Sequence, residues 1–119
     1  MCLFTAQDKP LIAKEPIRAY KILIAHNTSY ISPIQKFNYT QFIKNNLLVT
    51  GKIPVIEDEI EFLLNGIGRV ERGFHLCIRY PEALYCENGI IFECVIPAGS
   101  YYFINPYRTE ICTNQFRFI

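Results

Sequence analysis

The residues best suited to chemistry are His75 and Cys77, which stand two positions apart in the segment GFHLCIRY. If this segment is a strand, its alternation places both side chains on one face, where they can touch. Nucleophilic catalysis also needs a third group that orients the base, and no catalytic motif surrounds this pair. The simpler interpretation is a thiol on a sheet face and a histidine that satisfies a backbone carbonyl. The sequence therefore assigns no catalytic residue.

The same segment is better suited to recognition than to reaction. Period-two alternation places His75 and Arg79 on its more polar face, opposite the apolar face that begins with Phe74. The chain also has eight tyrosines, a residue type that stacks on rings or donates a hydrogen bond at the mouth of a pocket. The predicted binding residues are His75, Arg79, Tyr20 and Tyr30.

Neither a metal site nor a cofactor site is expected. The two histidines lie far apart, and the five cysteines contain no Cys-x-x-Cys pair. The Gly-x-Gly of GIGRVERG follows a predicted helix and precedes a strand, which reverses the order of a phosphate-binding turn. Gly99-Ser100 is interpreted as a turn between strands rather than an anion-binding nest.

Length and composition indicate a single domain over residues 1–119. A chain of this length can bury one core, and nine Phe with eight Tyr and no Trp favour strands. The net charge of +1 favours neither nucleic acid nor an anionic membrane surface as a partner. No apolar run approaches the core of a signal peptide or a membrane span, so a cytoplasmic protein is expected.

The cysteines favour a reduced protein. Their number is odd, their spacing is irregular, and most are flanked by apolar residues, where a free thiol behaves as a small buried hydrophobe. The sequence therefore predicts no disulfide.

Hydrophobic periodicity predicts most of the strands. The segments 17–26 and 90–96 are apolar on both faces, so we expect them to be neighbouring central strands. The polar segment 27–33 is predicted to be a loop, and 35–49 to be a strand that becomes irregular. The C-terminal segment alternates again and is predicted to be a further strand.

The best helical window is VIEDEIEFLLNGIG. Apolar residues recur at i, i+4, i+7 and i+8 from Ile56, acids crowd the first turn, and Asn65-Gly66 offers a left-handed stop. We interpret the acidic run as a solvated face rather than a partner surface. The predicted fold class is α+β: a small, strongly bent antiparallel sheet or partly open barrel of six or seven strands, with one or two short helices.

Short motifs in order along nearly the whole chain resemble a group of small uncharacterised proteins of gut Bacteroidetes and their phages. These motifs are MCLFT, PLIAKEPIRAYKIL, YISP, GFH, FECVIPAGSYYF and EICTNQFRFI. The group brings no function with it. The order of a GFH turn, a helix containing EA and a strand ending in IPxG is also similar to ADP-ribosyltransferase-like domains. That second resemblance implies roles for Arg18 or Tyr20 on an early strand and for a late glutamate, Glu110.

These observations favour a small, phage-encoded binding module without enzymatic activity. Its predicted partner is a protein or a small molecule, held by the polar faces of the first strand and of the Gly-Phe-His segment, and a homo-oligomer is a further expectation. The alternative is a reduced ADP-ribosyltransferase-like or NAD-binding fold. A third interpretation is a structural or interaction protein without a pocket.

Overall fold

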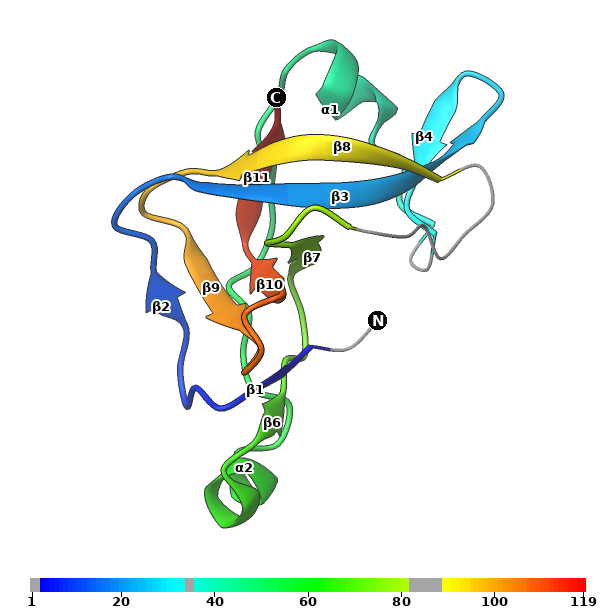
Figure 1. The fold of residues 1–119 in the computed structure, drawn as a ribbon. Coiled ribbons are helices and arrows are strands. Elements are labelled where there is room, and N and C mark those ends of the chain that lie inside the picture. Colours follow the sequence, from blue (N-terminus) through cyan, green and yellow to red (C-terminus); the bar gives the residue numbers. More distant parts are fainter. Residues whose placement is uncertain (1–2, 34–35, 82–88) are drawn as a thin grey trace.

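The computed structural model describes residues 3–33, 36–81 and 89–119 and is mainly β-sheet with two short helices (Figure 1). The elements in chain order are β1 (Phe4–Thr5), β2 (Leu11–Ile12), β3 (Ile17–His26), β4 (Ser29–Ile31), α1 (Thr40–Lys44), β5 (Val49–Thr50), α2 (Glu59–Asn65), β6 (Gly68–Arg69), β7 (Phe74–Cys77), β8 (Gly89–Ile96), β9 (Tyr101–Ile104), β10 (Glu110–Thr113) and β11 (Gln115–Phe118). The main sheet has the order β2-β9-β10-β7-β3-β8-β11-β5, with β4 added on β3. Strands β1 and β6 form a separate pair.

The expected antiparallel sheet with one or two helices is confirmed in this coarse form. Every strand pair within the described ranges is antiparallel, but the sheet is not closed into a barrel. The strands outnumber the six or seven expected because several are two-residue pieces at the edges of the sheet. A two-residue strand is too short to show an alternation of apolar and polar residues, so the sequence does not reveal it.

Strands β3 and β8 are the central pair, as predicted. Their register runs without a break from Ile17 opposite Ile96 to Ile24 opposite Gly89. One face of this pair packs on the larger core cluster, which contains Ala19, Leu23, Tyr39, Val49, Leu76, Cys94, Ile96, Ile111, Phe116 and Phe118. Edge-to-face contacts join the rings of this cluster, for example Phe116 and Phe118 at 5.2 Å.

A smaller core cluster lies on the opposite face of β10. It consists of Leu3, Val70, Phe103 and Cys112, with Ile56 packed against it. Because Ile111 belongs to the larger cluster and Cys112 to the smaller one, β10 is covered on both faces. Thiols at such positions are poorly ionised: burial raises the pKa of Cys94 and of Cys112 to about 12. Cys77, Cys94 and Cys112 are free thiols; the prediction of no disulfide also concerns Cys2 and Cys86, which lie outside the described residues.

The prediction of a loop over 27–33 was wrong for Ser29–Ile31, which form β4. Strand β4 folds back on β3 through the two-residue turn Asn27-Thr28, with His26 opposite Ser29. Asn27 has φ +55°, a left-handed conformation that asparagine tolerates better than most residues. The polar composition that indicated a loop belongs to a tight hairpin instead.

The prediction of a strand over 35–49 was also wrong, because α1 forms there. The side chain of Asn38 accepts hydrogen bonds from the backbone N–H and the hydroxyl of Thr40, which starts the helix. Phe42 and Ile43 then pack against the larger cluster. The alternation of Phe37 and Tyr39 that suggested a strand stops where the helix begins.

Helix α2 is confirmed, and it ends at the glycine expected. The Asp58 carboxylate accepts a hydrogen bond of 3.1 Å from the Glu61 backbone N–H, and Gly66 ends the helix at φ +72°. The apolar stripe of this helix is nevertheless left uncovered. In Figure 1, α2 projects from the lower end of the molecule, beyond the β1–β6 pair.

The sequence also predicts a helical turn at PEALYC, which opens on a proline, and a tight turn at Asn88-Gly89. Both fall wholly or partly on residues 82–88, outside the described residues. Within the described ranges, no helix has the length and apolar content needed to cross a bilayer.

Candidate functional site

A row of four side chains crosses the sheet on the face that includes Tyr20. Strand register places Tyr20 opposite Glu93 on β8 and opposite Cys77 on β7, and Cys77 opposite Glu110 on β10. Directly opposed residues of antiparallel strands point to the same face. The row therefore reads Glu93, Tyr20, Cys77, Glu110, with a carboxylate at each end.

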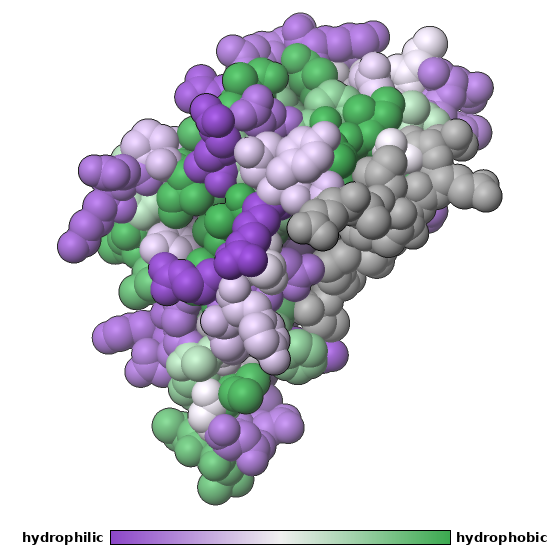
Figure 2. Space-filling model, viewed as in Figure 1, coloured by the Kyte–Doolittle hydropathy of each residue, from purple (hydrophilic) through white to green (hydrophobic). Residues whose placement is uncertain are grey.

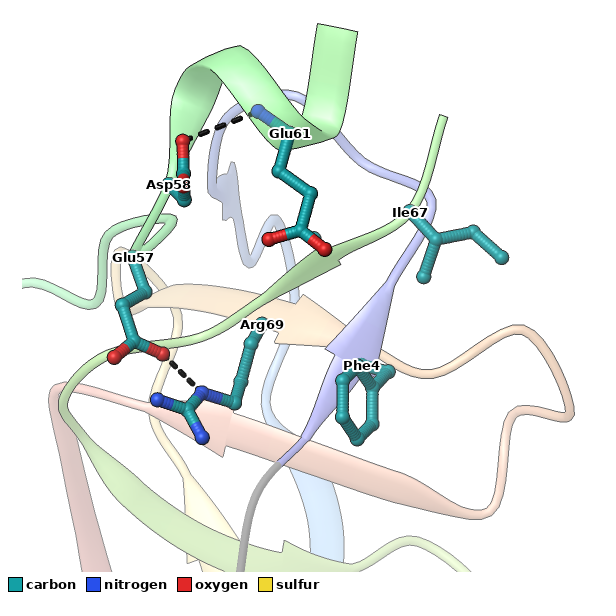
Figure 3. Close-up of a pocket in the computed structure, with 7 residues that line it drawn as sticks. Phe4, Glu57, Asp58, Glu61, Ile67 and Arg69 are labelled. Atoms are coloured by element: carbon teal, nitrogen blue, oxygen red, sulfur yellow. Dashed lines mark hydrogen bonds and ion pairs between the residues drawn. The ribbon is translucent and has the colours of Figure 1, made fainter. Parts of the chain in front are cut away.

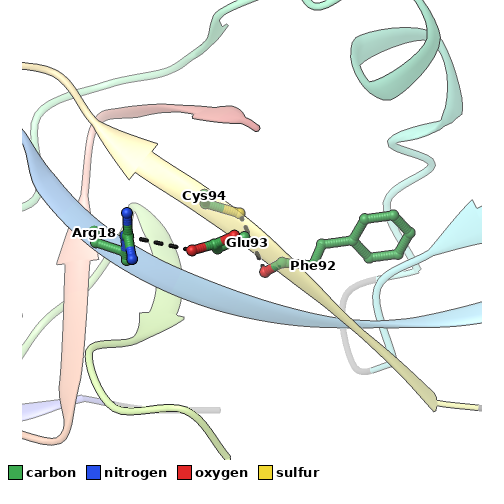
Figure 4. Close-up of polar contacts among 4 residues, drawn as sticks. All are labelled: Arg18, Phe92, Glu93 and Cys94. Atoms are coloured by element: carbon green, nitrogen blue, oxygen red, sulfur yellow. Dashed lines mark hydrogen bonds and ion pairs between the residues drawn. The ribbon is translucent and has the colours of Figure 1, made fainter.

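The contacts of this row tie its members into the sheet. The guanidinium of Arg18 forms an ion pair with the Glu93 carboxylate, Nε to Oε1 3.3 Å, between β3 and β8 (Figure 4). The ring of Tyr20 meets the ring of Tyr80 edge-on, with centroids 5.4 Å apart. Burial, followed by the charge of Glu110, raises the pKa of the Cys77 thiol, so this thiol is less reactive than a free cysteine.

His75 shares the face of Cys77, but it is half-buried rather than displayed. It lies opposite Cys112, the β10 residue of the smaller cluster. Burial, and then the charge of Lys21, lowers the pKa of the imidazole to about 4, so His75 is neutral at pH 7. Arg79 is exposed two residues beyond Cys77, past the end of β7.

Acid should destabilise the protein through His75. The pKa of this imidazole is lower in the folded state than its ordinary value of 6.5, so the unfolded state binds more protons between pH 6.5 and 4. The free energy of unfolding should therefore fall as the pH falls through this window. Urea unfolding at pH 7 and at pH 4.5 measures how much free energy of unfolding is lost between the two. We expect this loss to be smaller for His75→Gln than for the wild type. His26→Gln, at an exposed position, is the control; an equal loss in wild type and His75→Gln would contradict the assignment.

Tyr30 is not brought together with the other predicted binding residues. Its register partner Ala25 lies on the same face of β3 as Lys21, the face opposite Tyr20. The Tyr30 ring packs edge-on against Phe92 at 5.2 Å, and Tyr30 belongs to the periphery of the larger cluster. Its role in the fold is packing.

Lys21 is a buried amine that sequence reasoning did not single out. Its Nζ donates a hydrogen bond of 2.9 Å to the His75 carbonyl and lies 5.4 Å from the centroid of the Tyr39 ring. The β3–β7 pairing stops at Tyr20 and Cys77, and the ammonium takes the place of a backbone partner for the His75 carbonyl.

Burial makes the charge on Lys21 costly. It lowers the pKa of the amine from 10.5 to about 8, and the neighbouring thiols offset only part of this effect. The Tyr39 hydroxyl, in the same region, is buried without a hydrogen-bond partner among the described residues. Since the side chains of the larger cluster enclose this amine, we assign Lys21 a structural role.

The most exposed large aliphatic side chains of the described residues are on α2. Ile60, Leu63 and Leu64 are 73, 79 and 81% exposed. Ile67 and Phe4, which line the pocket next to α2, are also exposed, and these five residues form the α2 surface. Figure 2 shows this hydrophobic end of the molecule, with hydrophilic residues beside it.

The exposure of these side chains follows from how α2 is attached. Phe62 is the helical residue that turns inward, against Gly68 of β6. A Cβ at Gly68 would lie 2.9 Å from the Phe62 ring and 2.9 Å from Ile56. Because Phe62 occupies the inward side, Leu63 and Leu64 are directed into solvent.

A pocket of about 400 Å³ lies between α2 and the β1–β6 pair (Figure 3). Its lining is acidic and apolar: Phe4, Glu57, Asp58, Glu61, Ile67, Gly68 and Arg69. The Arg69 guanidinium donates a hydrogen bond to the Glu57 carboxylate, and this ion pair lowers the pKa of that carboxyl. The Asp58 carboxylate caps the helix. The site therefore presents apolar side chains next to negative charge.

No protein family, curated protein or solved structure matches this chain. Among the described residues, no group of three His, Cys, Asp or Glu side chains is placed to hold a metal ion. The resemblances drawn from the sequence motifs stay predictions.

Proposed function

We propose that this chain is a small cytoplasmic protein-binding module whose contact site is the α2 surface. The observation that carries the proposal is the exposure of Ile60, Leu63 and Leu64 together on one short projecting helix. Scattered exposed apolar residues are ordinary, but a contiguous group rimmed by charge is typical of a protein interaction site.

The energetics favour a partner for this surface. Covering a leucine or isoleucine side chain stabilises a complex by about 1.5–3 kcal/mol relative to leaving it in water. Ile60, Leu63 and Leu64 recur at i, i+3 and i+4, the spacing of a helix that anchors in a groove, and Ile67 follows just past the end of the helix. The face of Tyr20 and His75, where the sequence first suggested binding, carries more polar and half-buried residues.

A second candidate function is ADP-ribosyl transfer or NAD cleavage. What supports it is the row on the sheet, in which Tyr20 and Glu110 share a face with Cys77 between them. Arg18, the other residue that this hypothesis uses, is bonded to Glu93. A thermal shift with NAD that disappears in Glu110→Gln would favour this function over the first.

Site-specific photo-crosslinking tests the binding module. A benzophenone amino acid at position 63 should form adducts with another polypeptide chain in cells that produce the protein. The same group at position 107 is the control, because Tyr107 is 82% exposed and does not belong to the α2 surface. Leu64→Asp should abolish the adduct at position 63. Equal adducts at both positions, or none at position 63, would refute the proposal.

A further inference from the structure

A second exposed apolar surface lies around α1, and its charges are opposite to those of α2. Its apolar members are Phe37, Leu47 and Leu48, all more than two-fifths exposed. Its exposed cations are Lys36, next to Phe37, and Lys44 in the last turn of α1. These five residues form the α1 surface. Phe37 packs on Phe42 of α1, with ring centroids 6.1 Å apart, and the Leu47 N–H donates to the Phe42 carbonyl, so the surface is built on the helix.

The sequence separates the two charges sharply. No Asp or Glu occurs between Glu15 and Glu57, whereas the residues from Glu57 to Glu61 include four acids. Outside that run, the chain has seven acidic residues against twelve basic ones. The partial positive charge at the start of a helix favours acids in the first turn of α2, so the helix dipole partly explains that run. The dipole does not explain why lysines surround α1.

The two surfaces lie at opposite ends of one elongated molecule. Its principal extents are 46 × 29 × 23 Å, with α1 at the upper end and α2 at the lower end in Figure 1. One chain therefore cannot bring its own α2 surface onto its own α1 surface. A second copy of the chain can do so.

We infer that the α2 surface of one copy binds the α1 surface of a second copy, in a head-to-tail contact. This inference rests on the proposed function and names the partner of the same site. The leucines of α2 pack on Phe37 and Leu48, while the Glu59 and Glu61 carboxylates face the lysines of the α1 surface. Contacts between two different patches of identical chains are heterologous, and they build chains or rings.

The other exposed apolar strip of the described residues fits less well. Leu11 and Ile12 of β2 border an open groove, but Lys14 and Glu15 both line it. Their charges cancel, so this groove has no preference for an acidic helix. Charge complementarity therefore selects the α1 surface.

The contact should be weak, because each surface is small compared with a stable interface of about 800 Å² per partner. Sedimentation equilibrium of the purified chain should show the average mass rising between about 10 µM and 1 mM, a range set by this size class. Because exposed charges guide the contact, raising NaCl from 50 to 500 mM should weaken it about tenfold.

Two variants make the test specific. Leu63→Ser/Leu64→Ser removes apolar contact from α2, and Leu47→Ser/Leu48→Ser removes it from the α1 surface; each alone should be monomeric. Mixed in equal amounts, they should form a dimer, because each retains the surface that the other lacks, and its mass should stop at two chains. Glu59→Gln/Glu61→Gln keeps every apolar residue and should remove most of the salt dependence.

Leu11→Ser/Ile12→Ser is the matched control and should associate like the wild type. A wild-type chain that stays monomeric up to 1 mM would overturn the head-to-tail contact, as would a mixture of the two variants that stays monomeric. The crosslink at position 63 keeps the two hypotheses apart. An adduct with a different protein would retain the binding module while excluding a second copy as its partner.

Discussion

Gly73→Ala should lower the free energy of unfolding by about 4 kcal/mol, the sum of backbone strain and overpacking of about 2 kcal/mol each. Gly73 has φ +124°, a conformation that is open in practice only to glycine. An added Cβ would lie 2.5 Å from Cys112 Sγ and 3.1 Å from the Thr113 carbonyl oxygen. Both neighbours are buried on β10, so neither can move aside without disturbing the smaller cluster.

Gly66→Ala separates the two causes. Gly66 also has a positive φ, +72°, but nothing lies within 4 Å of a Cβ built there. Gly66→Ala should therefore lower the free energy of unfolding by only about 1 kcal/mol, because φ +72° lies in the left-handed region, where alanine is less strained than at +124°, and because it adds no overpacking. Urea unfolding of both variants, followed by circular dichroism, gives the comparison. A Gly73→Ala loss no larger than that of Gly66→Ala would contradict the close packing of β7 on β10.

The expected loss also explains the Gly-Phe-His segment. Gly73 permits the chain to pass directly over Cys112 just before β7 begins, and β7 then pairs with β10 along its whole length, from Phe74 to Cys77. The glycine is there for this close approach. His75 follows as a half-buried residue whose carbonyl accepts a hydrogen bond from the Lys21 ammonium.

The central strands could be predicted because their signal is local. A strand that is buried on both faces is apolar throughout, so β3 and β8 are visible in the sequence. Helix α2 is visible for a similar reason, since its cap, its acids and its terminal glycine are close together in the chain. Strand β4 and helix α1 depend on the turn at Asn27 and on the hydrogen bonds of Asn38, which have no hydrophobic period.

The candidate sites could be predicted only in part. The row of Glu93, Tyr20, Cys77 and Glu110 depends on the register of four strands, which periodicity within one strand does not supply. The exposure of α2 depends on Phe62, an apolar residue outside the predicted stripe, which takes the inward side against Gly68. A hydrophobic period indicates that a helix has an apolar face, but it does not say what covers that face.

Lys21 did leave a local signal. It is the one charged residue on the face of β3 that also holds Ile17, Ala19 and Leu23, and that face packs on the larger cluster. A lysine at such a position usually extends its stem and keeps the ammonium in water. Here the side chain stays inside, because the His75 carbonyl needs a donor where β3 and β7 separate.

Lys21→Met should raise the free energy of unfolding by about 2 kcal/mol at pH 7. The pKa of Lys21 falls from 10.5 to about 8 on folding, which corresponds to about 3 kcal/mol against the charged form. Methionine has a similar length and no charge, but it leaves the His75 carbonyl without its hydrogen bond, which costs about 1 kcal/mol. The net effect is a more stable protein, as when a buried charge is replaced by an apolar group.

The pH dependence of this gain identifies its cause. Between pH 8 and 10.5 the unfolded chain binds the proton on Lys21 more tightly than the folded chain does, so the wild type gains stability through this group as the pH rises. The raised pKa values of Cys94 and Cys112 act in the opposite direction above their ordinary value of 9, so the wild-type curve alone is ambiguous. Both proteins keep Cys94 and Cys112, so subtracting their free energies of unfolding removes most of the cysteine contribution. The difference in free energy of unfolding between Lys21→Met and the wild type should shrink steadily from pH 8 to pH 10.5. Lys44→Met, at an exposed position, should show no such trend. A gain from Lys21→Met that stays constant across this range would mean that packing, and not the buried charge, limits the stability of the core.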